Sequence, residues 1–103
     1  MSKDTVFSGV QPTGEIHLGN YLGAIKQFLN FQDNSDSIFC IVDQHAITVF
    51  QNPEVLRENV FSVLSIFLAC GLDPKKCILF NQSSVNEHSV LSWYLSCTAR
   101  IGW

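Results

Sequence analysis

Short apolar runs alternate along the chain with longer segments in which apolar residues recur every three or four positions. The first run, Thr5 to Val10, leads into a Pro-Gly turn and then into a periodic segment from about Leu18 to Phe31. Such spacing places apolar side chains on one face of a helix. The pattern therefore predicts a strand, a turn and a helix whose apolar face carries Leu22, Ile25 and Leu29.

The next part of the chain has the same order of elements. The continuously apolar stretch Ile38 to Val42 is typical of a strand buried on both faces of a parallel sheet. Asn52 and Pro53 form a good helix start, with a capping side chain followed by proline at the first position. We expect this helix to run to Cys70, with Gly71 as the left-handed residue that ends it.

A third strand is predicted at Cys77 to Phe80, and a last helix with an apolar stripe at about Asn86 to Cys97. The order β-α-β-α-β-α predicts an α/β fold. It corresponds to the first half of a Rossmann-type parallel sheet, with strand order 3-2-1 and flanking helices. Because Trp103 follows without a stop signal or polar tail, we expect the chain to be one part of a longer protein.

Composition limits the class of protein further. With 103 residues, 47% hydrophobic and 15% charged, the chain is long enough for one small globular domain. A net charge of −3 with scattered basic residues argues against strong nucleic-acid binding by this segment. No apolar run approaches the roughly 20 residues that cross a bilayer, and no targeting peptide is visible. We therefore expect a cytoplasmic protein with no membrane partner.

The four cysteines lack C-x-x-C spacing. Cys40 lies inside the second apolar run and Cys70 at the end of a periodic segment, so both resemble small buried hydrophobes. We favour reduced structural thiols, with disulfide or metal roles left as the alternative. No metal site is predicted.

Candidate chemistry is concentrated between Val6 and Tyr21. A helix that begins near His17 directs its free N–H groups and positive dipole end toward whatever lies above the first strand. His17 and Asn20, three positions apart, share one face of that first turn. Small residues that let a ligand approach the backbone are Gly9, Gly14 and Gly19. The arrangement indicates a nucleotide-phosphate site.

On the residues alone, other interpretations stay open. The loop matches neither G-x-G-x-x-G nor a Walker A sequence, and a plain turn between strand and helix would use the same residues. His45 follows the second strand, where open α/β sheets bind ligands, but it also suits a structural histidine beside Asp43. We assign His88 to the surface or an interface, and the Trp93-Tyr94 pair to the core or a subunit interface.

Two motifs together resemble one family. They are Ser8-Gly-Val-Gln-Pro-Thr-Gly14 with His17-Leu-Gly-Asn-Tyr21, and Cys40-Ile-Val-Asp-Gln-His-Ala-Ile-Thr48. In this order they resemble the tryptophanyl-tRNA synthetases, class I enzymes with a Rossmann catalytic domain. The resemblance spans nearly the whole chain. Tyrosyl-tRNA synthetases share the Pro-Thr-Gly and His-x-Gly-His pattern but normally carry a second histidine where Asn20 stands.

The resemblance implies roles for individual residues. The string from His17 to Asn20 matches the family's form of the HIGH motif, which contacts the ATP phosphates. The implied catalytic residues are His17, Asn20 and Thr13. The implied ATP-binding residues are Gln11, Pro12, Thr13, His17, Gly19 and Asn20. The implied tryptophan pocket consists of Phe7, Gly9, Val42 and His45.

The implied reaction is attack of the tryptophan carboxylate on the α-phosphorus of ATP, with Mg²⁺ and no organic cofactor, followed by transfer to tRNA(Trp). The family also implies a homodimer when complete, with little tRNA contact from this segment. A second Rossmann half with a Lys-Met-Ser-Lys-Ser loop and an anticodon-binding domain are absent, so we expect the segment alone to be inactive. The alternatives are another nucleotidyltransferase with a His-x-Gly-His loop, or a non-catalytic nucleotide-binding or interaction module.

Overall fold

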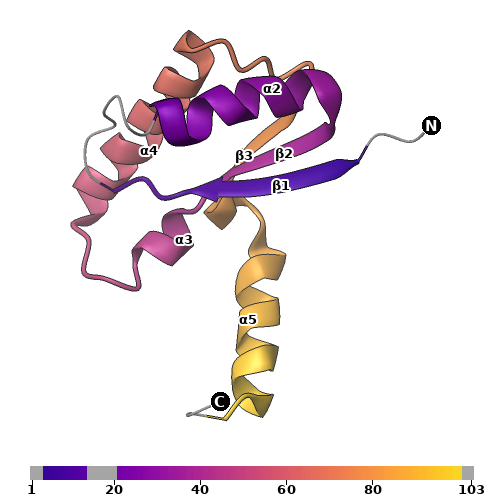
Figure 1. Ribbon diagram of the computed structural model, residues 1–103. Helices are drawn as coiled ribbons and strands as arrows, with labels where there is room; N and C mark the ends of the chain where they lie inside the picture. Colours follow the sequence, from indigo (N-terminus) through magenta and orange to yellow (C-terminus); the bar gives the residue numbers. More distant parts are fainter. Residues whose placement is uncertain (1–3, 14–20, 101–103) are drawn as a thin grey trace.

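A parallel three-stranded sheet forms the centre of the molecule (Figure 1). In the computed structural model, the described residues are 4–13 and 21–100. The strands are β1 (Thr5–Val10), β2 (Asp36–Ile41) and β3 (Ile78–Asn81), and they pair in the order β1-β2-β3. The predicted α/β class with a parallel sheet is confirmed. Central β2 contains the longest apolar run of the three strands and pairs with a neighbour on each edge.

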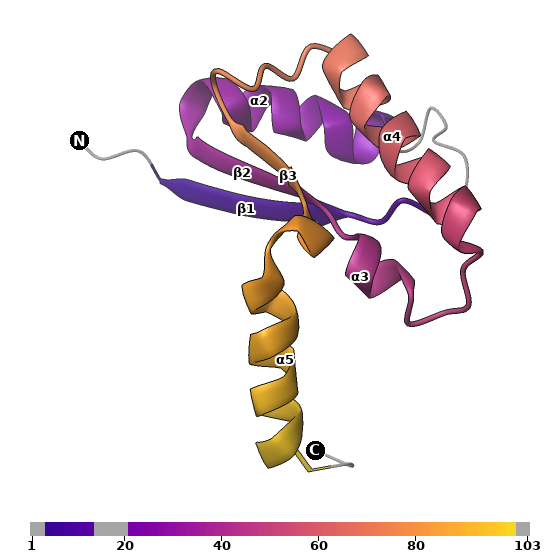
Figure 2. The same ribbon diagram turned by 180° about the vertical axis from the view of Figure 1, so that it is seen from behind.

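Helices surround this sheet unevenly. They are η1 (Tyr21–Ile25, a π-helical segment), α2 (Lys26–Asn34), α3 (Asp43–Ala46), α4 (Pro53–Ala69), the 3-10 turn η2 (Gln82–Ser84) and α5 (Asn86–Thr98). Helices α2 and α4 lie on one side of the strands, whereas α5 extends away on the other side (Figures 1 and 2). The two connecting helices therefore cover one face of the sheet and leave the other open.

The ends of α4 are set by the residues that the sequence indicates. The Asn52 Oδ1 atom accepts hydrogen bonds from the backbone N–H groups of Glu54 (2.9 Å) and Val55 (3.2 Å), which have no partner inside the helix. Gly71, just after the helix, has φ of 106°, a region that disfavours residues with a Cβ. The predicted start of this helix is confirmed, and the helix ends at Ala69, one residue before the predicted Cys70.

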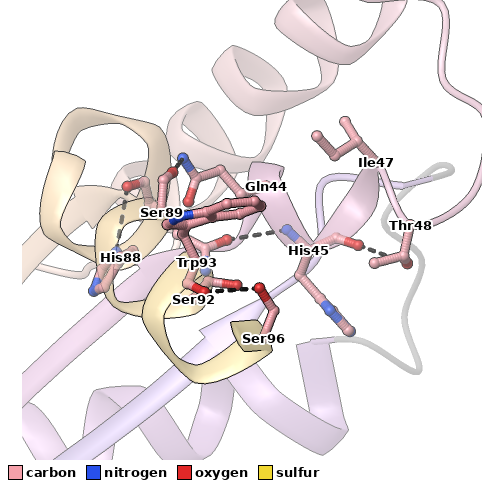
Figure 3. A pocket seen from close by; sticks show the side chains of 10 residues that line it. Gln44, His45, Ile47, Thr48, His88, Ser89, Ser92, Trp93 and Ser96 are labelled. Carbon is pink, nitrogen blue, oxygen red and sulfur yellow. Dashed lines mark hydrogen bonds between the residues drawn. The ribbon is translucent and has the colours of Figure 1, made fainter. Parts of the chain in front are cut away.

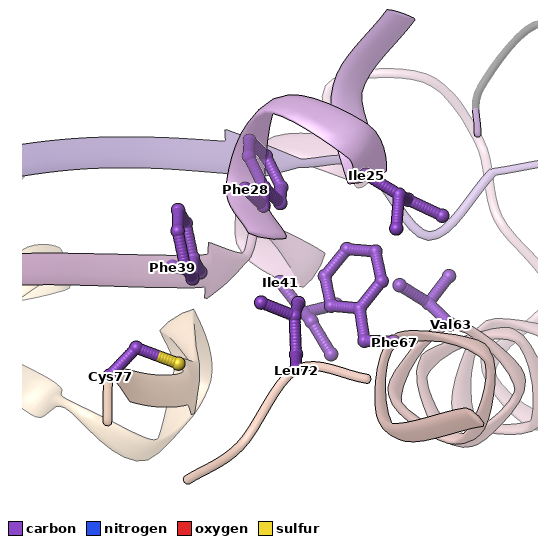
Figure 4. Close-up of a cluster of buried hydrophobic side chains, with 8 residues drawn as sticks. All are labelled: Ile25, Phe28, Phe39, Ile41, Val63, Phe67, Leu72 and Cys77. Carbon is purple, nitrogen blue, oxygen red and sulfur yellow. The ribbon is translucent and has the colours of Figure 1, made fainter. Parts of the chain in front are cut away.

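The core lies between the covered face of the sheet and helices α2 and α4 (Figure 4). Phe28 of α2 stacks on Phe39 of β2 with ring centroids 4.3 Å apart, and Phe67 of α4 meets Phe28 edge-on at 5.9 Å. The buried residues of this cluster are Ile25, Phe28, Phe39, Ile41, Val63, Phe67, Leu72 and Cys77. Aromatic contacts thus join both helices to the central strand.

Four expectations need correction. Strand β2 begins and ends earlier than predicted and is fully covered on one face only, because both connecting helices lie on the same side. The open face exposes Phe7 (61%) and Ile78 (59%). Helix α5 has no buried residue among those described, so its apolar stripe is not packed in this chain. Cys70 is half-buried rather than buried.

The first predicted helix differs as well. Its described part begins with the π-helical η1 and continues through α2 to Asn34, three residues beyond the predicted end at Phe31. The predicted start near Leu18 lies outside the described residues. The short helices α3 and η2 were not predicted, because four and three residues are too few to show a hydrophobic period. Across residues 4–13 and 21–100, no helix has the length and apolar character needed to cross a membrane.

Candidate functional site

Three of the predicted pocket residues, Phe7, Gly9 and Val42, lie on the open face of the sheet. Gly9 pairs in register with Cys40, two residues before Val42. A Cβ atom added at Gly9 would lie only 2.9 Å from Val42 Cγ1, so these two residues touch in a way that only glycine allows. Phe7 lies two residues before Gly9, on the same face of β1, and its side chain is exposed. The structure therefore brings Gly9 and Val42 into contact and places Phe7 on the same face.

His45 lies in α3, just beyond the carboxyl end of β2. Its backbone N–H donates to Gln82 Oε1 at 3.1 Å, and its carbonyl accepts from Thr48 Oγ1 at 2.8 Å. The residue is exposed. Backbone contacts on both sides fix the position of His45, while its side chain stays accessible.

His45 also lines a groove of about 490 Å³ between α3 and α5 (Figure 3). The groove is lined by Gln44, His45, Ile47, Thr48, Gln82, His88, Ser89, Ser92, Trp93 and Ser96. A hydrogen bond of 2.7 Å from Gln44 Nε2 to Ser89 Oγ joins its two walls. Phe7, Gly9 and Val42 are not among the described residues that line it. His88 lies in a surface groove, as the prediction of a surface or interface role allows, whereas Trp93 is exposed in the same groove and is not in the core that was one of its two predicted places.

The residues predicted to bind ATP are described only in part. Pro12 is buried, whereas Gln11 and Thr13 on either side of it are exposed directly after β1. Pairing with the next strand continues to this point, since the Val42 N–H donates to the Val10 carbonyl at 2.9 Å. The remaining members, His17, Gly19 and Asn20, and the loop glycine Gly14 lie outside the described residues.

A carboxylate between the ends of β2 and β3 is the feature that the sequence did not reveal. Asp43 Oδ1 accepts from the backbone N–H groups of Gln44 (3.0 Å) and Ser83 (2.9 Å). Asp43 Oδ2 accepts from Asn81 Nδ2 at 3.0 Å, and the same amide donates to Ser83 Oγ at 2.8 Å. The sequence does show that polar residues follow both strands. Parallel strands of one sheet end at the same edge, so this pattern could have indicated that these side chains lie close together.

The charge of Asp43 also acts on the thiol of Cys40. Burial is the main cause that raises the pKa of Cys40 above its ordinary value of 9.0, and the nearby Asp43 carboxylate raises it further. The thiol is therefore neutral at physiological pH, as expected for a structural cysteine. Within residues 4–13 and 21–100, no group of three or more His, Cys, Asp and Glu residues is placed to hold a metal ion.

Comparison with known proteins identifies the family. A family model described as tRNA synthetases class I (W and Y), the enzymes for tryptophan and tyrosine, matches residues 2–103. The chain belongs to this family of class I tRNA synthetases.

Among curated relatives, the tryptophan–tRNA ligases of Brucella melitensis and Mesorhizobium japonicum are 54% and 55% identical over 101 residues. The match covers 98% of this chain and 28% of each relative. The resemblance to tryptophanyl-tRNA synthetases is thus confirmed, and the chain spans less than a third of these relatives' length.

Solved structures of tryptophanyl-tRNA synthetases also resemble this chain. The tryptophanyl-tRNA synthetase of Campylobacter jejuni superposes with a TM-score of 0.89 at 39% identity, covering 98% of this chain and 32% of that one. A second structure of that protein, complexed with ADP and tryptophan, gives 0.88 at 40% identity and covers 95% of this chain and 31% of that one. A tyrosyl-tRNA synthetase from Archaeoglobus fulgidus, 23% identical with a TM-score of 0.79, shares the fold.

Proposed function

We propose that these residues are the first half of the catalytic domain of a tryptophan–tRNA ligase, with the 3-2-1 strand order of a Rossmann half. The observation that carries the proposal is the match of 98% of the chain to curated tryptophan–tRNA ligases at 54% identity or more. In the complete protein the activity is ATP-dependent formation of tryptophanyl-adenylate and transfer to tRNA(Trp). We expect the segment alone, which spans 28% of the length of each relative, to be inactive.

The proposed tryptophan pocket lies on the open face of the sheet. Phe7 provides an exposed aromatic surface, and Gly9 allows the backbone of β1 to form a close floor beside Val42. His45 provides a polar group at the carboxyl end of the neighbouring strand. An apolar surface with a polar group at the end of the neighbouring strand suits an indole ring. The Campylobacter jejuni protein complexed with ADP and tryptophan supports the same pair of ligands here.

The proposed ATP site follows β1 directly, at Gln11, Pro12 and Thr13, and includes His17, Gly19 and Asn20. Imidazole, hydroxyl and amide groups can donate hydrogen bonds to phosphate oxygens as charge develops on the departing pyrophosphate. The reaction needs no covalent nucleophile, because positioning and electrostatic stabilisation are sufficient for phosphoryl chemistry.

We propose that Mg²⁺ binds together with the ATP phosphates. Mg²⁺ in nucleotide sites is commonly held by substrate phosphates with one or two carboxylates. The described residues do not form a set of three or more ligands that would hold such an ion alone. We therefore assign no catalytic step to the ion.

The complete protein is proposed to be a cytoplasmic homodimer that binds tRNA(Trp). The support for dimerisation is the exposed apolar surface of α5, on which Trp93 is 69% and Tyr94 is 66% exposed. Apolar side chains of this size on one helix are typical of surfaces covered by another chain or domain. Size-exclusion chromatography with light scattering on the full-length protein tests the dimer.

Exchange of labelled pyrophosphate into ATP by the full-length polypeptide that carries these residues tests the activity. We expect exchange that depends on L-tryptophan and is absent with L-tyrosine or with no amino acid. Exchange without any amino acid would indicate another nucleotidyltransferase. Nucleotide binding with no exchange would indicate a non-catalytic module, and tyrosine-dependent exchange would contradict the choice of amino acid.

A further inference from the structure

We propose that Asp43 is a positioning residue of the tryptophan site: its carboxylate fastens the end of β2 to the end of β3 and thereby fixes His45. This inference rests on the proposed function, because it concerns the same pocket. Asp43 itself makes no contact with the proposed ligands in this account. It acts through the short helix α3, of which it is the first residue and His45 the third.

The carboxylate makes contacts on both sides of the gap between the two strands. On its own side it accepts from the Gln44 N–H in the first turn of α3 at 3.0 Å. On the opposite side it accepts from the Ser83 N–H in η2 at 2.9 Å and from Asn81 Nδ2 at 3.0 Å. Two of these bonds join residues that are 40 and 38 positions apart. Asp43 is therefore more than a local cap of its own helix.

A second bond crosses the same gap and ends on His45 itself. The His45 N–H donates to Gln82 Oε1 at 3.1 Å, and Gln82 lies between the two residues that Asp43 holds. If the Asp43 carboxylate is removed, η2 loses its bond at Ser83 and the position of the Gln82 side chain becomes less restricted. The position of His45 is therefore coupled to the hydrogen bonds that the Asp43 side chain accepts.

The orientation of Asn81 supports this coupling. Asn81 Nδ2 donates to both Asp43 Oδ2 and Ser83 Oγ, while its Oδ1 is buried without a hydrogen-bond partner among the described residues. Rotating the amide would place Oδ1 against the Asp43 carboxylate, so the orientation that leaves Oδ1 unpartnered is the one that preserves the contact. Asn81 is thus held by Asp43.

Kinetics of tryptophan-dependent pyrophosphate exchange in the full-length protein test the assignment. We expect Asp43→Ala to lower kcat/KM for tryptophan about 10- to 100-fold, because a displacement near 1 Å at a reacting site can cost about 10². The KM for ATP should stay within roughly a factor of two, since the ATP residues follow β1 rather than β2. Asp43→Asn keeps one carbonyl oxygen for the Ser83 and Gln44 N–H groups but turns an amide donor toward Asn81 Nδ2, so it should recover only part of the loss. If Asp43→Ala does not fold, the kinetics of Asp43→Asn test the assignment instead.

A double-mutant cycle with His45→Ala separates positioning from general destabilisation. If Asp43 acts through His45, adding Asp43→Ala to His45→Ala should change kcat/KM for tryptophan by less than about twofold. The matched control is Asp73→Ala. Asp73 Oδ1 also accepts a backbone N–H bond, from Lys75 at 2.9 Å, but lies in the turn before β3, away from the strands' carboxyl ends. This control should lower stability without changing tryptophan kinetics.

Three results would overturn the assignment. Independent, multiplicative losses from Asp43→Ala and His45→Ala would show that Asp43 does not act through His45. Equal kinetic effects of Asp43→Ala and Asp73→Ala would show that Asp43 is important only for stability. Absence of tryptophan-dependent exchange in the wild type would overturn the proposed function, and this inference with it. Because only the last result appears in the unmodified protein, the two failures are distinguishable.

Discussion

Replacement of Gly9 by alanine tests the contact that brings β1 and β2 together at the proposed pocket. The added Cβ would lie 2.9 Å from Val42 Cγ1, whereas carbon atoms in contact are normally about 3.5–4.0 Å apart. The branched Cβ of valine restricts rotation about χ1, so relieving the contact by rotation carries a cost. Either Val42 leaves its rotamer or the two strands separate slightly.

The size of the effect follows from two opposing contributions. Overpacking a close contact costs about 1–3 kcal/mol. Reduced freedom of the unfolded chain offsets about 0.4–1 kcal/mol of that cost when alanine replaces glycine. We therefore expect Gly9→Ala to lower the free energy of unfolding by about 0–2.6 kcal/mol in the full-length protein. Since one methyl group in a pocket changes discrimination about 10- to 200-fold, the KM for tryptophan should rise by at least about tenfold.

Gly23 provides the matched control. A Cβ added at Gly23, in η1, would meet no atom within 4 Å. Gly23→Ala should therefore stabilise the protein by about 0.4–1 kcal/mol and leave tryptophan kinetics unchanged. Urea unfolding followed by circular dichroism gives both free energies, and pyrophosphate exchange gives KM. Equal stabilisation by the two alanines, with an unchanged KM for tryptophan in Gly9→Ala, would refute the close contact and its place in the pocket.

Three further predictions concern the scaffold. Phe67→Ala removes a ring that is 1% exposed and should lower the free energy of unfolding by about 3–5 kcal/mol, whereas Phe50→Ala, at a position 92% exposed, should change it little in the same urea titration. Asn52→Ala removes the cap of α4 and should lower the free energy of unfolding by about 1 kcal/mol, whereas Asn52→Asp should keep most of the stability of the wild type. An unchanged unfolding midpoint in Asn52→Ala would contradict the capping role. Burial raises the pKa of the Cys40 and Cys77 thiols above 9.0, so the folded state keeps these protons longer than the unfolded state does. Their contribution to stability is complete below pH 9 and is lost as pH rises through the raised values, which unfolding titrations from pH 7 to 10.5 should detect as a fall confined to the alkaline arm.

Much of the sheet and of α4 is predictable from local chemistry. The first apolar run becomes β1 with the predicted bounds, and the capping Asn52 and the left-handed Gly71 flank α4 as expected. These features depend on residues close together in the sequence. A capping side chain and a glycine with positive φ act within one turn of the chain, so their effect is visible before the fold is known.

The connection through Asp43 was not predictable in the same way. It depends on the parallel register that brings the end of β2 beside the end of β3, and it joins Asp43 to residues 38 and 40 positions away. The exposure of α5 was not predictable either. Its apolar spacing is equally typical of a packed helix, and its exposure depends on the direction in which the helix extends from the sheet. Gly9 and Val42 lie in contact and Phe7 is on the same face of the sheet, whereas the role of all three in binding stays a prediction.

The central claim is that His17 acts on the triphosphate rather than on the amino acid. Single-turnover formation of tryptophanyl-adenylate by the full-length His17→Ala protein, measured together with its equilibrium affinity for tryptophan, tests it most directly. We predict a loss of about 10²–10³ in the rate of adenylate formation, with tryptophan affinity unchanged. An unchanged rate, or an equal loss in tryptophan binding, would contradict the account.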